Sequence, residues 1–191
     1  MVYKTHTATS ASLSLLPVFL PKDINPFIGM PIDVFLIMFS VIFIFSLLPD
    51  LDEPGSFLSQ KFPFYFVSFF LSLFTTHRGL THNFIFSIVF FLFLYAVTLP
   101  IHHIEWFHTI FFVAFISYIG HIIGDSMTIG GIKRAFYPFS KSTFWIIPKS
   151  LRFKTQSLFE SFLLLFILTF LSFEIYYFFM INNTFNKLLS L

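Results

Sequence analysis

Apolar residues occur along the chain in long runs with few polar positions between them, a pattern typical of helices that cross a membrane. Such a helix needs about 17–25 residues. The runs of suitable character are about Thr7–Leu20, Ile32–Leu48, Phe84–Leu99, Phe107–Gly124 and Leu158–Ile181. The first run is short and rich in Ser and Thr, which makes it the weakest of the five. The pattern predicts an all-α, polytopic integral membrane protein with about five transmembrane helices.

A sixth apolar run, Phe62–Thr75, is too short for a regular span and begins at Pro63, which suits the first turn of a helix. We expect it to form a re-entrant or interfacial helix that returns to the side from which it came. If it crossed the membrane instead, the acidic residues after Leu48 would lie on the opposite face from His77 and His82.

The distribution of Lys and Arg predicts the topology. The loop at about 126–156 is basic, and its cations are Lys133, Arg134, Lys141, Lys149, Arg152 and Lys154. By the positive-inside rule this loop is cytoplasmic. With residues 62–75 re-entrant, every other Lys and Arg except Lys22 and Lys187 falls on the same side.

Composition supports a membrane protein. Of the 191 residues, 57% are hydrophobic and only 10% are charged, and the mean hydropathy is +0.86. A soluble domain carries near a quarter charged residues, so lipid must cover most of this surface. The net charge of +2 is too small to indicate a nucleic-acid partner. There is no cysteine, so any metal site must use His, Asp and Glu. We expect residues 1–191 to form a single membrane-embedded helical domain.

Two acidic residues, Asp50 and Asp52, follow Pro49 at the end of the second predicted helix. In an extended segment, side chains two positions apart point the same way. Neighbouring carboxylates repel each other unless a cation lies between them. The pair therefore indicates either a cation site or a solvated helix terminus that leads into a turn.

His121 and Asp125 are four residues apart in a predicted helix, which places both on one face and suits two ligands of one metal. The alternative is a buried histidine that is hydrogen-bonded to an aspartate. Ionisable groups at the edge of a membrane span are candidates for function.

His77 and His82 bracket Arg78 at a spacing that fits a turn better than a continuous helix. Thr81 or Asn83 could cap the helix that follows. The guanidinium of Arg78 suits bidentate binding of phosphate, although a basic loop that touches lipid headgroups explains it equally well.

The last predicted helix opens with Ser157 and Glu160, the pattern of a capping box. The free amides of such a helix start could also hold an anion. Four ionisable residues fall on the opposite, external side and are excluded from the candidate site: His102, His103, Glu105 and His108.

In order along the chain, these motifs resemble those of the YdjM-like family of inner-membrane proteins, which are regarded as metal-dependent hydrolases. The matching motifs are Thr5-His6, Pro49-Asp50-Leu51-Asp52 with Ser56, His77-Arg78-Gly79-x-Thr81-His82, Gly120-His121-x-x-Gly124-Asp125-x-x-Thr128-x-x-Gly131, and Ser157-x-x-Glu160. The chain departs from the family pattern at Asn83, where Ser is usual, and at Gln156, where Gly is frequent. Neither departure removes a candidate ligand.

The resemblance implies a bacterial inner-membrane hydrolase with a bound divalent metal. His and carboxylate ligands suit Zn, Mn or Fe, of which we expect Zn or Mn, and the seven implied side chains suffice for two ions. The implied metal positions are His6, Asp50, Asp52, His77, His82, His121 and Asp125. The candidate catalytic residues are Asp52, Arg78 and Glu160. The helical His-x-x-x-Asp element is also similar, as a distant analogy, to that of zinc-dependent phospholipase C enzymes.

Together, these patterns lead to a first hypothesis of a membrane-bound, metal-dependent hydrolase. It would be a phosphoesterase that acts at the cytoplasmic face on a lipid or lipid-linked phosphate. The second hypothesis is a non-catalytic, metal-stabilised scaffold or regulator that binds a cytoplasmic partner or anionic lipid through the basic loop. A transporter is the third and least favoured hypothesis, because the candidate residues lie at helix ends rather than at the midplane and no inverted repeat is visible in the sequence.

Overall fold

The computed structural model describes residues 1–74 and 79–182, and this part of the chain is mostly helical. The α-helices are α1 (Tyr3–Leu15), α2 (Ile32–Leu47), α3 (Phe64–Phe74), α4 (Phe84–Val97), α5 (Phe107–Ser126) and α6 (Leu158–Ile181). Short 3-10 segments are η1 (Leu16–Phe19), η2 (Leu48–Asp52), η3 (Leu99–Ile101) and η4 (Lys149–Leu151). A two-stranded antiparallel ribbon pairs β1 (Ile132–Lys133) with β2 (Thr143–Phe144).

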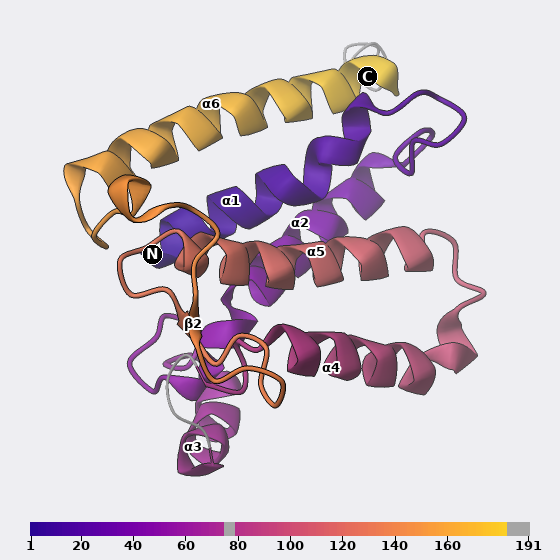
Figure 1. Cartoon of the computed structure of the whole chain (residues 1–191). Coiled ribbons are helices and arrows are strands. Elements are labelled where there is room, and N and C mark those ends of the chain that lie inside the picture. The colour runs from indigo at the N-terminus through magenta and orange to yellow at the C-terminus, as the bar shows by residue number, and fades with distance from the viewer. Residues whose placement is uncertain (75–78, 183–191) are drawn as a thin grey trace.

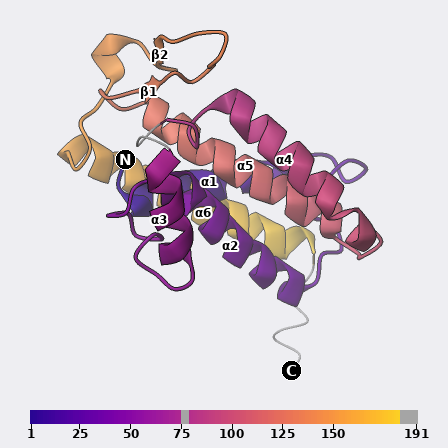
Figure 2. The same cartoon turned by 90° about the horizontal axis from the view of Figure 1, so that it is seen from below.

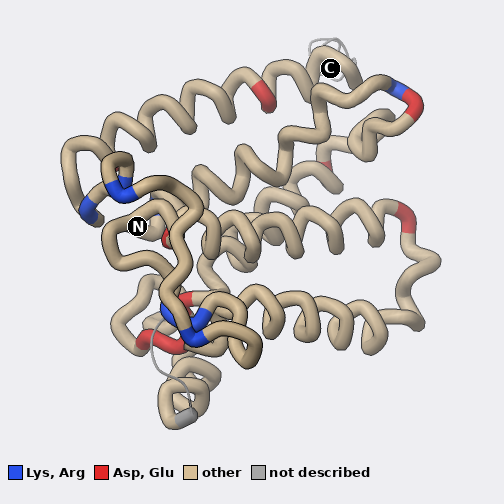
Figure 3. Tube along the Cα trace, in the orientation of Figure 1, with Lys and Arg blue, Asp and Glu red and all other residues tan. Residues whose placement is uncertain are grey.

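The helices pack around α1, which contacts α2, α5 and α6, while α4 lies along α5 (Figures 1 and 2). Helices α1, α4 and α6 begin at the end of the bundle where the N-terminus lies, and α2 and α5 end there (Figure 1). Lys and Arg gather at this same end (Figure 3). We call it the basic end. The clustering agrees with the side predicted from the Lys and Arg positions.

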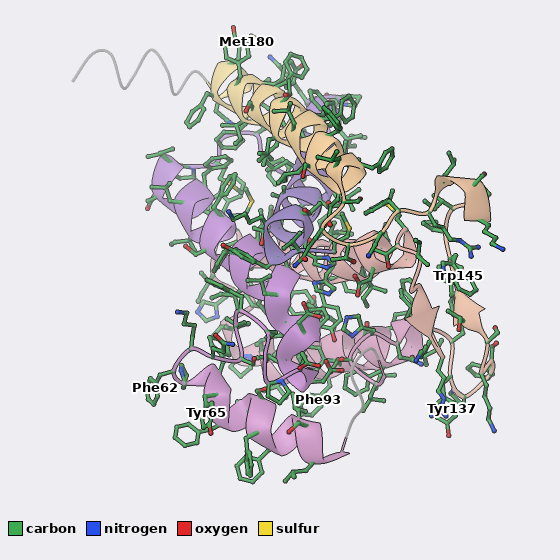
Figure 4. The ribbon with its side chains drawn as sticks, turned by 90° about the vertical axis from the view of Figure 1, so that its left-hand side faces the viewer. Phe62, Tyr65, Phe93, Tyr137, Trp145 and Met180 are labelled. Atoms are coloured by element: carbon green, nitrogen blue, oxygen red, sulfur yellow. The ribbon has the colours of Figure 1, made fainter. Side chains whose placement is uncertain are left out.

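Three helical segments are long and apolar enough to cross a membrane: Ile32–Asp52, Phe107–Ser126 and Leu158–Ile181. Helix α4 is apolar but shorter, and α1 is shorter still. The expected helical membrane architecture is thus confirmed, whereas the count of five spans stays a prediction. Large apolar side chains cover the outer surface, including Phe62, Tyr65 and Phe93 (Figure 4). Lipid is the solvent that suits such a surface.

Helix α3 does not carry the chain to the other end of the bundle. The Thr81 hydroxyl donates a hydrogen bond to Asp52 Oδ2 at 2.6 Å, so the chain leaves η2 and returns beside it. This return is what the re-entrant or interfacial prediction for residues 62–75 requires. Asn83 caps α4 by accepting a hydrogen bond from the Phe86 amide, one of the two caps that the sequence offered.

Glycine allows α1 to approach α5 closely. A Cβ atom on Gly120 would lie 3.0 Å from the Ser10 Cα atom, and one on Gly124 would lie 3.3 Å from His6 Nδ1. Small residues one turn apart permit this contact between helix backbones. The Ser10 hydroxyl then reaches the Ser117 carbonyl oxygen on α5 at 2.8 Å. The close contact brings the first turns of α1 against the last turns of α5.

Candidate metal centre

Four helix ends meet at the basic end and supply a group of His and Asp side chains. His6 comes from the start of α1, Asp50 from η2 at the end of α2, and His82 from the residue before the cap of α4. His121 and Asp125 come from the last two turns of α5. The four residues other than Asp50 are buried, and the Asp50 side chain keeps 20% of its surface exposed.

The ligand atoms of three of these residues converge closely. His121 Nε2 lies 3.3 Å from His82 Nε2 and 3.4 Å from Asp50 Oδ1, and His82 Nε2 lies 3.5 Å from Asp50 Oδ1. Around a metal with bonds of about 2.0–2.1 Å, tetrahedral ligand atoms are separated by about 3.4 Å. The three atoms thus have the spacing of ligands on one face of such a tetrahedron.

The tautomers of both imidazoles favour a metal. His121 Nδ1 lies 2.6 Å from the Ser46 carbonyl oxygen, which can only accept, so this nitrogen carries the proton. The Thr81 hydroxyl donates its hydrogen to Asp52, so its oxygen is left to accept from His82 Nδ1 at 3.1 Å. In the neutral imidazoles both Nε2 atoms are then unprotonated, and they face each other. Two lone pairs at 3.3 Å repel unless a cation lies between them.

A second group shares His121 and consists of His6, His121 and Asp125. The Asp125 carboxylate connects the two groups, because Oδ1 lies 3.3 Å from His6 Nε2 and Oδ2 lies 3.6 Å from His82 Nε2. The amino group of Met1 also donates to Oδ1 at 2.8 Å. The residues present therefore fit one metal ion and offer ligands toward a second.

The electrostatics of His6 suit a ligand. Its ring stacks on that of His121 with centroids 3.7 Å apart, and its Nδ1 atom has no hydrogen-bond partner among the described residues. Burial lowers the pKa of His6 to about 4, because removal from water disfavours the charged imidazolium. The imidazole is therefore neutral near pH 7, the form in which histidine binds metals.

Two other predicted site residues make different contacts. Asp52 is buried and accepts the Thr81 hydrogen bond, which places it behind His82. Glu160 accepts from the Val2 amide at 2.8 Å and from the Gln156 amide at 2.7 Å, while its own amide bonds to Ser157. These contacts tie the start of α1 to the start of α6. Neither residue belongs to the two described ligand groups, and their catalytic roles stay predictions.

Two further predicted residues, the ligand His77 and the phosphate-binding Arg78, lie outside the described residues.

Two residues that the sequence did not indicate as ligands support the site. Thr81 belongs to one of the family motifs, but its sequence position indicated only a capping role. Tyr118 donates to the Thr81 carbonyl oxygen at 2.5 Å and carried no signal in the sequence, since an aromatic residue on an apolar helix is ordinary.

A polar pocket of about 250 Å³ opens beside the ligands. It is lined by Met1, His6, Asp50, Glu53, Gly55, Ser56 and Asp125. The lining includes three carboxylates and, among the described residues, no Lys or Arg. An acidic lining accepts a cation readily, and it can accept an anion only after bound cations have neutralised it.

The fold and the site together define a class: a helical membrane protein whose buried His and Asp side chains could hold a metal ion. The chain belongs to the YdjM inner membrane protein family, whose profile matches residues 1–190. The resemblance seen in the sequence motifs is thereby confirmed over the whole chain. Comparisons with curated proteins and with solved structures gave no match.

Proposed function

We propose that this protein is a membrane-bound, metal-dependent hydrolase that cleaves a phosphoester of a lipid or lipid-linked substrate at the cytoplasmic face. The observation that carries the proposal is the convergence of the Nε2 atoms of His82 and His121 with Asp50 Oδ1, next to an open polar pocket. A divalent metal bound there would supply a water of lowered pKa and polarise the bond under attack.

Other roles in the proposed reaction, access of the substrate and orientation of the ligands, fall to residues of the chain. Asp50 is the partly exposed ligand and lines the pocket, so it stands between the buried ligands and an entering substrate. The Asp52–Thr81 pair orients His82, and the Ser46 carbonyl orients His121. Hydrogen bonds of this kind, one step outside the ligands, fix the tautomer and the ring orientation of metal-binding histidines.

The surroundings of the pocket support an amphiphilic substrate. Segment η2 separates the polar pocket from an apolar cavity of about 320 Å³. Asp50 and the adjoining Glu53 line the pocket, whereas Leu48 and Leu51 line the cavity. A substrate with a charged head and an apolar chain finds both kinds of surface at this end of the bundle.

The test is phosphate release by the detergent-purified full chain with Mn²⁺ or Zn²⁺, using phosphatidic acid and a water-soluble phosphomonoester. We expect metal-dependent release, faster on the lipid. Asp50→Asn should lower it by at least about 100-fold, because a lost ligand removes several kcal/mol of charge stabilisation. Asp33→Asn, at the exposed other end of α2, is the matched control and should leave the rate unchanged.

A non-catalytic scaffold is the second candidate, favoured by the complete burial of His82 and His121. Structural metal sites are closed, whereas catalytic sites keep an open position. Protein that binds metal and hydrolyses neither ester would contradict the hydrolase proposal and support the scaffold.

A further inference from the structure

An isolated acid lies inside the last membrane helix, far from the metal centre. Glu174 follows Glu160 by fourteen positions, close to four turns, so both side chains lie on the buried face of α6. Glu160 is hydrogen-bonded to backbone amides, as described above. Glu174 has none of its surface exposed, and neither of its carboxyl oxygens has a hydrogen-bond partner in the described part of the chain.

The facing helix offers Glu174 a hydroxyl group and no cation. The polar group that approaches the carboxyl is the Ser12 side chain of α1. The hydroxyls of Ser10 and Ser14 are already bonded to α5, through the Ser117 and Val113 carbonyl oxygens.

The charged and titratable groups of the neighbouring elements lie elsewhere. On α1 they are Tyr3, Lys4 and His6, the nearest of which is six positions or about 9 Å along the helix from Ser12. Segment η1 has none. On α2 the only one is the exposed Asp33. On α6 itself, Tyr176 is exposed and Tyr177 packs on Phe19.

An ionised carboxylate in such surroundings costs several kcal/mol unless it is paired. The group must therefore hold a proton or a small metal cation. Metal cations such as Mg²⁺ and Ca²⁺ require six or more oxygen ligands, and this location provides two carboxyl oxygens and one hydroxyl. The oxygen count favours the proton.

We propose that Glu174 is an intramembrane protonation site, a neutral carboxylic acid at physiological pH that donates its hydrogen toward Ser12 and so connects α6 to α1. The site is independent of the hydrolase proposal. It is a place where the protein binds and releases a proton within the apolar part of a predicted span.

The test uses the acid's reactivity. A hydrophobic carbodiimide reacts with a protonated carboxyl group in an apolar environment, because the acid adds across a C=N bond: its proton passes to nitrogen and its oxygen to carbon. The adduct mass is therefore the sum of protein and reagent. We would treat the purified full chain in detergent with dicyclohexylcarbodiimide and locate the adduct by mass spectrometry of the digest.

We expect one adduct, at Glu174, formed at about pH 6 and reduced by more than about tenfold at about pH 10, where the acid ionises. Glu174→Gln should abolish the adduct, and the matched variant at the exposed Glu105, Glu105→Gln, should retain it. Mapping in the unmodified chain gives the answer even if the variant folds poorly. An unlabelled Glu174, labelling that is the same at both pH values, or protection by Na⁺ at constant pH would overturn the proposal.

Discussion

At the scale of single residues, the candidate metal site depends on which nitrogen of each imidazole carries the proton. The Ser46 carbonyl oxygen fixes the tautomer of His121, and the Thr81 hydroxyl fixes that of His82. Asp52 acts one step further out, because its carboxylate sets the direction in which the Thr81 hydroxyl donates. The chemistry of the two ligands is therefore controlled by groups that do not touch the metal.

Replacing Thr81 tests this control. Thr81→Val keeps the shape of the side chain but removes the hydroxyl, so His82 Nδ1 loses its acceptor and Asp52 loses its donor. We expect metal affinity to fall by about 10- to 100-fold while the protein still folds. Competition with a chelator, measured by elemental analysis, checks the value. Thr169→Val, on the exposed face of α6, is the control, and equal affinities in the two variants would contradict the assigned role.

The sequence identifies some of these residues and not others. The spacing of His121 and Asp125 places them on one helical face, and the structure brings both to the cluster. The Ser46 contact uses a backbone carbonyl, which no residue pattern reveals. Glu174 was not singled out, although a single acid deep in an apolar run of this length is itself a signal of function.

At the scale of elements, the position of α1 decides whether the site forms. The sequence predicted a weak span at Thr7–Leu20, but the helix begins at Tyr3 and ends at Leu15. Its many Ser and Thr residues do not suit a helix that faces lipid. In the structure α1 packs against α2, α5 and α6 instead, and the Ser10 and Ser14 hydroxyls donate hydrogen bonds to carbonyl oxygens of α5. By contrast, α6 has the predicted bounds, because Ser157 caps its start.

The contact between α1 and α5 can be widened at Gly120. Gly120→Val would place a Cβ atom 3.0 Å from the Ser10 Cα atom and add two methyl groups beyond it, so α1 must move away and take His6 with it. We expect a loss of about 1–3 kcal/mol of stability, typical of overpacking, together with reduced metal content. Thermal unfolding and elemental analysis measure the two effects.

Ala96→Val is the matched control for this substitution, because it adds similar carbons on the exposed face of α4. Normal metal content in Gly120→Val at normal stability would show that the close approach is unnecessary.

At the scale of the whole molecule, the direction of each helix brings the chemistry together. Helices α1, α4 and α6 start at the basic end, and α2 and α5 finish there, so residues far apart in sequence meet (Figure 1). The positions of Lys and Arg predicted this common end. The positive-inside rule assigns loops to a side from their charge alone, so the prediction does not depend on how the helices pack. The ribbon of β1 and β2 was not predicted, since strands of two residues are too short to show an alternating pattern.

Side chains from α1, η2, the start of α4 and the end of α5 together form the candidate metal centre. Elemental analysis of the detergent-purified protein tests it most directly, with Asp50→Asn and His121→Ala beside the unchanged chain. His103, at the other end of the bundle, provides the control variant His103→Ala. We expect near-stoichiometric metal in the unchanged chain and the control, and none in the two site variants. Metal-free protein that cannot be reloaded, or site variants that keep their metal, would show that these residues do not form a metal centre.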